Sequence, residues 1–125
     1  MIKILIIEDE KLIRKYLHRA ISNKSKTSIK SCGNGIEALE LLKNNKFNLI
    51  FCDVMLDDIT GFDIFEEVRS QQLIYSPQEN FIFITAYTSP EILNKINLLK
   101  CRLIKKPFST INEFLDIINE HESLP

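Results

Sequence analysis

The chain has 125 residues, 45% of them hydrophobic and 26% charged, which suits one globular domain and excludes a disordered chain. Sixteen basic residues against 17 acidic ones leave a formal net charge of -1, so the composition gives no indication of binding to nucleic acid or to an anionic membrane. Its three cysteines form no CxxC pair, and no apolar run approaches the roughly 20 residues of a membrane span. We therefore expect a single domain over residues 1–125, in the cytoplasm and with reduced thiols.

The first part of the chain alternates between strand and helix patterns. Ile2–Ile7 is apolar apart from one lysine and lacks a secretory cleavage site, so it predicts a buried first strand. From Lys11 the apolar residues recur at helical spacing, at Leu12, Ile13, Tyr16, Leu17, Ala20 and Ile21. Ser28–Cys32 predicts a short second strand, followed by a turn at Gly33–Gly35. The second helix has its apolar residues at Ile36, Leu39 and Leu42.

A central strand is expected over Phe47–Val54. The stretch Phe47–Asp53, FNLIFCD, is an apolar run that ends abruptly in a carboxylate. Leu49–Cys52 shows no alternation of polar and apolar residues, so both faces of this strand are expected to be buried, as in the middle of a parallel sheet. Asp53 then stands at the carboxyl end of a central strand, where open α/β sheets place their ligands.

The next segment is a loop and a third helix. Met55–Gly61 predicts the loop, and Thr60 with Asp63 three residues later resembles a capping box at the start of the helix. Ser70–Asn80 is a longer polar connection, which we expect to be a variable surface loop.

The last part of the chain completes the alternation. Phe81–Thr85 predicts a fourth buried strand, and Ser89–Glu91 combines a cap, a proline and an acid as at the start of a fourth helix. Arg102–Lys105 predicts a fifth strand, and Thr110 caps a last helix. Five strands that alternate with five helices imply right-handed crossovers and a doubly wound parallel sheet, which is an α/β fold.

Reactive side chains follow four of the five predicted strands. The first strand is followed by Glu8 and Asp9, the third ends at Asp53, the fourth ends at Thr85, and the fifth is followed by Lys106. In a parallel sheet these strand ends lie on one edge, so three carboxylates, a hydroxyl and an ammonium are expected to converge there.

Three carboxylates in one place repel one another unless a cation is present, and hard oxygen ligands of this kind suit Mg²⁺. A divalent cation, a lysine and a hydroxyl beside a carboxylate form a site for handling a phosphoryl group, because they neutralise or bond to its oxygens. Asp53 can then be the nucleophile, since carboxylates form acyl phosphates.

Each of these residues has an ordinary interpretation when taken alone. Glu8 and Asp9 could belong to a solvated turn, and Asp53 could cap a helix. Thr85 is a common strand residue, and Lys106 could be a surface lysine. It is their convergence at one sheet edge that favours a functional site.

At this point the chain resembles a known family, the receiver domain of two-component response regulators, over essentially its whole length. No single matching piece is specific, but all of them occur in order and at the family's spacing. The pieces are Ile4–Glu10, Asn34–Leu39, Asp53–Leu56, Gly61, Thr85-Ala86 and Lys106–Phe108. The resemblance implies a flavodoxin-like sheet with the strand order 2-1-3-4-5.

The resemblance also implies a role for each matching residue. Asp53 would be phosphorylated by a sensor histidine kinase, a phosphotransfer protein or a small phosphodonor. Asp9, Asp53 and the backbone carbonyl of Met55 would bind Mg²⁺ directly, and Glu8 would bind it through water. The domain would be a signalling switch with self-phosphotransfer and autodephosphorylation only, not an enzyme that turns over a substrate.

Two further residues complete the implied switch. Lys106 would contact the phosphoryl group, and Thr85 would swing in to bond to it. The resemblance also implies a cis peptide bond before Pro107. Met55 and Tyr87 border the site, and we expect them to limit the access of water to the phosphoryl group.

The sequence departs from the family pattern at positions that matter for signalling. Leu103 stands where the family usually has an aromatic switch residue, and Leu99-Lys100 replaces the usual Gly-Ala before it. Asp57 stands where a proline is common, and Thr60 where an aspartate usually precedes the glycine. We therefore expect an intact acceptor site and an activation that does not use an aromatic rotamer flip at residue 103.

Two other functions remain open on the sequence. The first is a protein-interaction module on the receiver fold that signals without phosphorylation, which Leu103 favours. The second is an aspartate-nucleophile phosphatase, with Asp57 as its acid, but no insertion is long enough to cap a substrate. A flavin- or dinucleotide-binding function is less favoured still, because Glu8–Glu10 follows the first strand in place of a glycine-rich turn and would repel phosphate.

The expected partner surface is formed by the fourth helix, the fifth strand and the fifth helix, as the family implies. It presents a modest basic patch made of Lys95, Lys100, Arg102 and Lys105, whose alternative interpretation is a solvated face. We expect no output domain within the chain, so the signal would pass to a downstream protein or to an output domain outside it. No direct binding to nucleic acid or membrane is expected.

Overall fold

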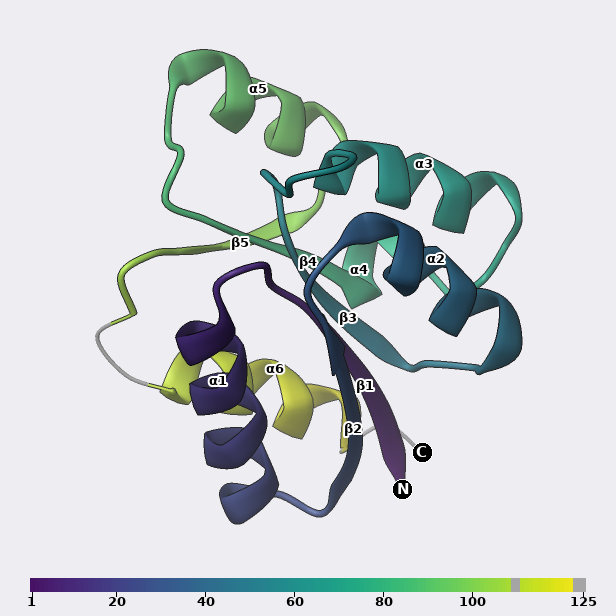
Figure 1. Ribbon diagram of the computed structural model, residues 1–125, viewed down its shortest axis with the longest axis vertical. Coiled ribbons are helices and arrows are strands. Elements are labelled where there is room, and N and C mark those ends of the chain that lie inside the picture. The colour runs from purple at the N-terminus through teal and green to yellow at the C-terminus, as the bar shows by residue number, and fades with distance from the viewer. Residues whose placement is uncertain (109–110, 123–125) are drawn as a thin grey trace.

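The structure is a computed structural model that describes residues 1–108 and 111–122. Within these residues, five parallel strands form one sheet in the order β2-β1-β3-β4-β5 (Figure 1). The strands are β1 (Ile2–Ile7), β2 (Thr27–Cys32), β3 (Leu49–Asp53), β4 (Phe81–Thr85) and β5 (Arg102–Lys105). The helices are α1 (Lys11–Lys24), α2 (Gly35–Asn44), α3 (Gly61–Ser70), α4 (Pro77–Asn80), α5 (Pro90–Leu98) and α6 (Asn112–Glu122). The predicted α/β class and the implied strand order are confirmed.

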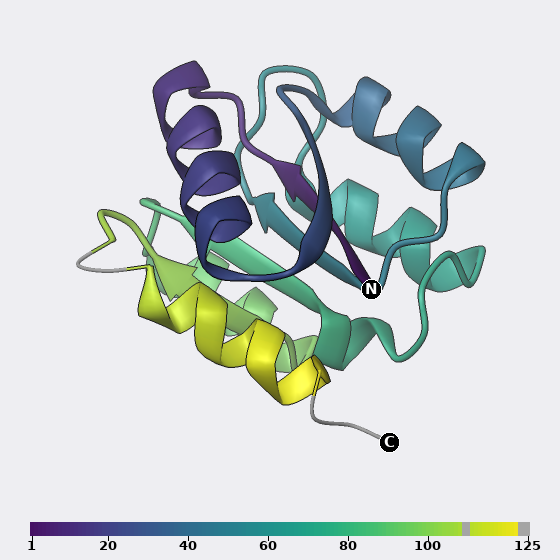
Figure 2. The ribbon, with the colours of Figure 1, turned by 90° about the horizontal axis from the view of Figure 1, so that it is seen from below.

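Helices cover both faces of the sheet and bury two apolar layers. α1 and α6 lie side by side on one face, while α2, α3 and α5 pack on the other (Figure 2). Neighbouring strand residues contribute to opposite layers. Leu5 and Ile50 belong to the layer under α2, α3 and α5, whereas Ile6 and Phe51 belong to the layer under α1 and α6.

The central strand is buried along its whole length, as its unbroken apolar run predicts. All five residues of β3 are buried, including Asp53 at its carboxyl end. The strand begins at Leu49 and not at Phe47, because Asn48 bonds to the backbone of Lys3 outside the ladder. Its amide N–H donates to the Lys3 carbonyl and its Oδ1 accepts the Lys3 N–H, each at 2.8 Å.

Three apolar residues expected in the inner stripes of the first two helices are exposed. Leu12 and Tyr16 of α1 are 83% and 51% exposed, because the buried stripe of this helix is centred on Leu17 and Ile21. At about 100° per residue, a position next to the stripe already points away from the sheet. Ile36 in the first turn of α2 is 63% exposed for the same reason.

The connection Ser70–Asn80, which was expected to be a loop, contains a short helix, α4, that the sequence did not predict. Pro77 begins it, as suits a residue whose fixed φ matches the first helical turn, and the Asn80 side chain donates to the Tyr75 carbonyl at 2.6 Å. Ile74 in the same connection is buried in the core, so the connection is more than a surface loop. The helices expected as fourth and fifth are therefore α5 and α6.

The predicted helix starts are confirmed where they lie among the described residues. Thr60 and Asp63 form a complete capping box at the start of α3, and Ser89 caps α5, with Pro90 in its first turn. The predicted cap of the last helix, Thr110, lies outside the described residues. None of the helices in the described ranges is both long and apolar enough to cross a membrane.

We predict that Gly61→Ala destabilises the fold, because α3 begins against the backbone that carries Asp53. A Cβ atom at position 61 would lie 2.4 Å from the Asp53 carbonyl oxygen and 3.1 Å from the Val54 Cα, so the backbone would have to move. The expected loss is about 1–3 kcal/mol in the free energy of unfolding, measured in urea. Ser70→Ala at the exposed end of α3 is the control and should change it by less than about 0.5 kcal/mol. Equal stability of the two variants would contradict the prediction.

Candidate functional site

Three carboxylates meet at the carboxyl edge of the sheet. Glu8 and Asp9 follow β1, and Asp53 is the last residue of the neighbouring strand β3. One oxygen from each of them lies within 4.8 Å of the others. Glu8 and Asp53 are buried and Asp9 is half-buried, so the convergence expected from the strand ends is present in the structure.

Lys106 supplies the positive charge at this edge. Its Nζ lies 2.7 Å from Asp53 Oδ2 and 2.5 Å from Glu8 Oε1, and its side chain is only 10% exposed. The Lys106 amide also donates to the Thr85 carbonyl at 2.9 Å, which ties the end of β5 to β4. The peptide bond between Lys106 and Pro107 is cis, as the resemblance implies.

Glu8 is the buried carboxylate that keeps an oxygen without a hydrogen bond among the described residues. Its Oε2 accepts the Glu10 N–H at 3.1 Å, but its Oε1 is fully buried and accepts no well-aligned hydrogen bond from the described residues beyond its ion pair with Lys106. Burial therefore raises the pKa of Glu8 from 4.5 to about 7. An incompletely satisfied buried carboxylate beside two others is the oxygen donor set that fits a hard divalent cation such as Mg²⁺.

Lys106 stays protonated in this environment. Burial by itself lowers the pKa of its ammonium, but the hydrogen bonds and charges of Asp53 and Glu8 outweigh burial and raise the pKa above its ordinary value. The edge therefore holds one fixed cation among three acids, which leaves room for further positive charge.

The other residues expected at the site differ in where they lie relative to Asp53. Thr85 is fully buried, and its Oγ1 accepts the Tyr87 N–H at 2.9 Å, while the Tyr87 side chain is 57% exposed. The Met55 N–H donates to Asp53 Oδ1 at 3.2 Å, and its side chain is 41% exposed. Leu103 packs instead against the core layer under α2, α3 and α5, so it does not line the carboxylate cluster.

Two residues that sequence reasoning did not single out support the site through backbone contacts. The Arg14 guanidinium donates to the Glu8 carbonyl at 2.7 Å and so braces the turn after β1. Asp58, in the loop after β3, accepts N–H groups from Gly35 and Ile36 at the start of α2. These three hydrogen bonds join side chains to the backbone of other segments of the chain, and the spacing of side chains in the sequence carries no signal for them.

The three cysteines are free thiols, and none contributes a nucleophile to the site. Burial raises the pKa of Cys52 far above its ordinary value, that of Cys32 to about 12 and that of Cys101 to about 11. Cys52 therefore acts as the small apolar strand residue that the sequence predicts.

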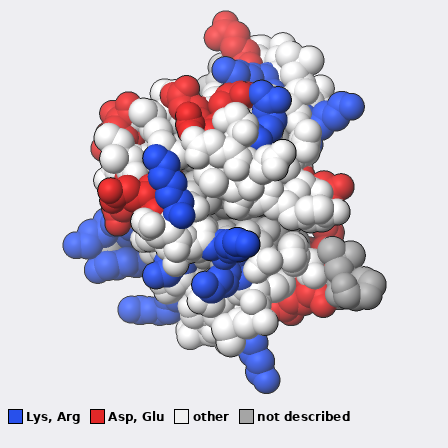
Figure 3. Space-filling model, turned by 90° about the vertical axis from the view of Figure 1, so that its right-hand side faces the viewer, with Lys and Arg blue, Asp and Glu red and all other residues white. Residues whose placement is uncertain are grey.

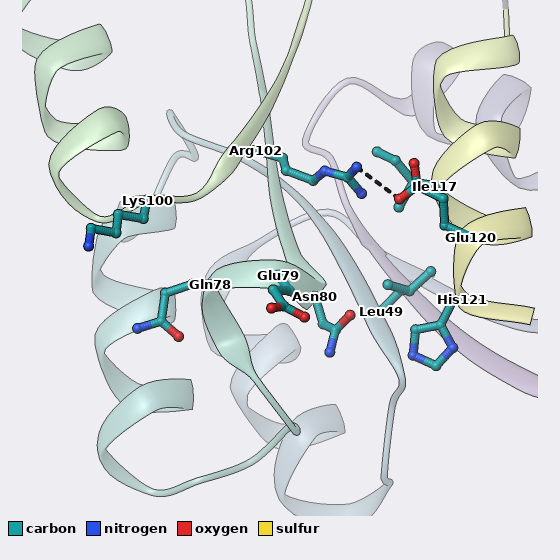
Figure 4. A pocket seen from close by; sticks show the side chains of 9 residues that line it. All are labelled: Leu49, Gln78, Glu79, Asn80, Lys100, Arg102, Ile117, Glu120 and His121. Carbon is teal, nitrogen blue, oxygen red and sulfur yellow. Dashed lines mark ion pairs between the residues drawn. The ribbon is translucent and has the colours of Figure 1, made fainter. Parts of the chain in front are cut away.

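A pocket of about 360 Å³ lies at the opposite end of the sheet. It is lined by the first residues of β3 and β5, Leu49 and Arg102, and by His121 near the end of α6 (Figure 4). Arg102 is already paired with Glu120 at 2.8 Å. This pocket is separate from the carboxylate cluster. Figure 3 shows that one face of the molecule carries basic and acidic side chains together.

The chain matches the model of the response regulator receiver domain over residues 4–119, and it therefore belongs to that family. Domains of this family are the receivers of two-component systems, in which they act in signalling and interact with histidine kinases.

Particular relatives agree with this assignment. The chain is 31% identical over 107 residues to the transcriptional regulatory protein CrdR of Helicobacter pylori, a match that covers 85% of this chain and 48% of that protein. It is 26% identical over 128 residues to a response regulatory protein of Staphylococcus epidermidis, covering 88% and 51%. Its fold is similar to that of the chemotaxis response regulator CheY4 of Vibrio cholerae, with a TM-score of 0.80, 24% identity and 96% and 98% of the two chains covered. The chain thus spans about half the length of CrdR and of the Staphylococcus epidermidis protein.

We predict that Glu8→Gln removes part of the pH dependence of stability in the Mg²⁺-free protein. The pKa of Glu8 is about 7 in the folded chain and 4.5 as its ordinary value, so between these values the folded state holds a proton that the unfolded state releases. The contribution of Glu8 to the free energy of unfolding therefore falls as pH rises from about 4.5 to about 7, and is constant above that range.

The measurement is urea unfolding across this pH range in the presence of a chelator, for the native chain and for Glu8→Gln. Glu10→Gln, an exposed carboxyl two residues away, is the matched control and should keep the native slope. A Glu8→Gln variant with the same slope as the native chain would show that Glu8 titrates normally.

Proposed function

We propose that Asp53 accepts a phosphoryl group in a Mg²⁺-dependent reaction, from a histidine kinase, a phosphotransfer protein or a small phosphodonor. The observation that supports this most directly is the contact between the buried Asp53 carboxylate and Lys106, at 2.7 Å, beside two further acids. Buried carboxylates that meet an ammonium at the ligand-binding edge of a parallel sheet suit the handling of a charged group and not a purely structural role.

In this proposal the acids divide into acceptor and metal ligands. Asp9, Asp53 and the Met55 carbonyl would hold Mg²⁺, with Glu8 acting through water. The bound ion would supply positive charge to the phosphoryl oxygens. In the transfer, an Asp53 carboxylate oxygen forms the bond to phosphorus, while the bond from phosphorus to the donor breaks and its electron pair leaves with the donor. Lys106, whose Nζ lies 2.7 Å from Asp53 Oδ2, would then neutralise the phosphoryl oxygens.

Thr85 would link the phosphorylated site to the outer face. Its hydroxyl oxygen accepts the Tyr87 N–H, and a Thr85 side chain that turned to donate to a phosphoryl oxygen would give up that bond. The change would then spread to the face formed by α5, β5 and α6. Leu103 is not aromatic and is a half-buried residue packed against the core, so the proposed change starts at Thr85 and Tyr87 and needs no aromatic flip at residue 103.

The partner surface is less basic than its sequence suggests. Arg102 is paired with Glu120, and the Lys95 ammonium lies 4.6 Å from the centre of the Phe62 ring. Because two of the four cations are engaged within the chain, these contacts favour a solvated face over one built for an acidic partner. The proposal includes a single receiver domain over residues 1–125 acting in the cytoplasm, with a downstream protein or an output domain outside the chain as its target.

A phosphorylation-independent interaction module is the second candidate function. The specific observation in its favour is Leu103, a half-buried residue packed against the core at the position where the resemblance expects a mobile aromatic side chain. Under this alternative the carboxylate cluster would bind a cation without taking up phosphate.

The test is incubation with acetyl phosphate and Mg²⁺, followed by intact-mass measurement of the native chain and of Asp53→Asn. We expect one added phosphate on the native chain, none on the variant, and none when a chelator is present from the start. An unmodified native chain that still binds Mg²⁺ would refute the acceptor role and support the interaction module.

We also predict that Met55 slows the loss of the phosphoryl group. Its backbone N–H bonds to Asp53 Oδ1, so the residue borders the site, and its thioether cannot orient a water molecule as an amide can. Met55→Asn should therefore lose its phosphate several-fold faster than the native chain, measured by intact mass after removal of the donor. Leu98→Asn, an exposed apolar residue at the end of α5, is the control and should match the native rate. Equal rates for Met55→Asn and the native chain would contradict the prediction.

A further inference from the structure

The loop that follows Asp53, residues 54–60, is called the acceptor loop below, and it is hydrogen-bonded to α2, which lies far away in the sequence. Asp58, in the loop between β3 and α3, accepts the Gly35 N–H on Oδ1 and the Ile36 N–H on Oδ2, both at 2.9 Å. Gly35 and Ile36 are the first two residues of α2. One carboxylate of the acceptor loop therefore satisfies two N–H groups that the start of a helix leaves without an intrahelical partner.

The same loop and helix are also in close van der Waals contact. A Cβ atom at Gly35 would lie 2.2 Å from Ile59 Cγ1, so the glycine leaves just enough room for the loop. The Ile59 N–H adds a third hydrogen bond to Asp58 at 2.8 Å. Burial alone would raise the pKa of Asp58, but the three backbone donors lower it below its ordinary value, so the carboxylate is charged near neutral pH.

The other end of the loop is held as well. The Gly61 N–H donates to the Val54 carbonyl at 2.7 Å, which closes the loop next to the acceptor. Met55 lies inside this closed loop, with its N–H on Asp53 Oδ1. The backbone of Met55 is thus placed between two anchors, the acceptor strand on one side and Asp58 on the other.

We propose that Asp58 is a positioning residue, which holds the acceptor loop against α2 and so keeps the Met55 backbone in place beside Asp53. The role of the Met55 carbonyl as a Mg²⁺ ligand rests on the proposed function, whereas the placement of the Met55 N–H does not. Loss of the anchor would loosen the loop without touching any of the three clustered carboxylates.

The neighbouring residue provides a matched control. Asp57 is exposed, and it makes no hydrogen bond or ion pair with the residues that the structure describes. Asp57→Ala and Asp58→Ala remove the same charge from the same loop, so any general electrostatic effect on the acidic site is closely matched between them. A difference between the two variants therefore reports the hydrogen bonds of Asp58.

The first readout is amide hydrogen exchange in Mg²⁺-free protein, resolved by residue with NMR. We expect Asp58→Ala to speed exchange at Gly35, Ile36 and Met55 by about tenfold or more, because these N–H groups lose their acceptors or their fixed geometry. Asp57→Ala should leave the three rates unchanged. Native rates at Met55 in Asp58→Ala would overturn the proposal.

The second readout is the dissociation constant for Mg²⁺, measured by calorimetry on folded protein. Asp58→Ala should weaken Mg²⁺ binding several-fold relative to Asp57→Ala, whereas a purely structural role would lower stability without changing this constant. Gly35→Ala keeps every charge but pushes on Ile59, and it should weaken Mg²⁺ binding in the same direction. If Asp58→Ala fails to fold, the Mg²⁺ dissociation constant of Gly35→Ala still tests the proposal.

The outcomes separate this inference from the proposed function. A native chain that takes up phosphate, with equal Mg²⁺ affinity and equal exchange in Asp57→Ala and Asp58→Ala, overturns the positioning role alone. Suppose instead that the native chain takes up no phosphate, while Asp58→Ala, but not Asp57→Ala, speeds exchange at Met55. That result supports the positioning role of Asp58 and overturns the proposed role of Asp53 as phosphoryl acceptor.

Discussion

The ion pairs of Lys106 with Asp53 and Glu8 are the interaction on which the rest of this structure depends. Two buried carboxylates and a third half-buried one lie at one sheet edge, and each would be costly there without a cation. The single ammonium reaches two of them, and its backbone N–H fastens β5 to β4 through Thr85. Lys106 therefore both offsets the charge of two carboxylates and joins the ends of two neighbouring strands. The Glu8 oxygen that remains without a hydrogen bond is compatible with a divalent cation at this edge.

Around this edge, rigid and adjustable parts are distinct. β3 is buried on both faces and holds Asp53 firmly, while α3 begins so close to its backbone that only glycine fits at position 61. The loop after β3 is held by hydrogen bonds that Asp58 accepts from α2, and the Thr85 side chain is held by one hydrogen bond, which its hydroxyl oxygen accepts from the Tyr87 N–H. Hydrogen bonds of this kind can be exchanged for others at small net cost, whereas core packing cannot. A signal that starts at Asp53 would accordingly travel through the loop and through Thr85.

The sequence predicted those features that follow from local rules. The unbroken apolar runs identified the buried strands, a parallel sheet brought Glu8, Asp53 and Lys106 to one edge, and the Thr60–Asp63 box marked the start of α3. The predictions from sequence were wrong where the burial or conformation of a residue depends on its place in the whole molecule. Leu12 and Ile36 are exposed, since a helical stripe is narrower than its apolar positions suggest, and α4 interrupts a supposed loop. The sequence did not predict the supporting roles of Arg14 and Asp58, because their partners are backbone groups that only the fold brings near.

The most direct test of the central claim is to locate the phosphoryl group chemically. Borohydride reduces an acyl phosphate to an alcohol, so a phosphorylated aspartate becomes homoserine and can be found by peptide mass spectrometry. After treatment with acetyl phosphate and Mg²⁺, we predict homoserine at position 53 and at no other aspartate, in an amount that matches the phosphate added to the intact chain. Homoserine at Asp9 or Asp57, or none at all in a chain whose mass has risen by one phosphate, would contradict the assignment of Asp53 as the acceptor.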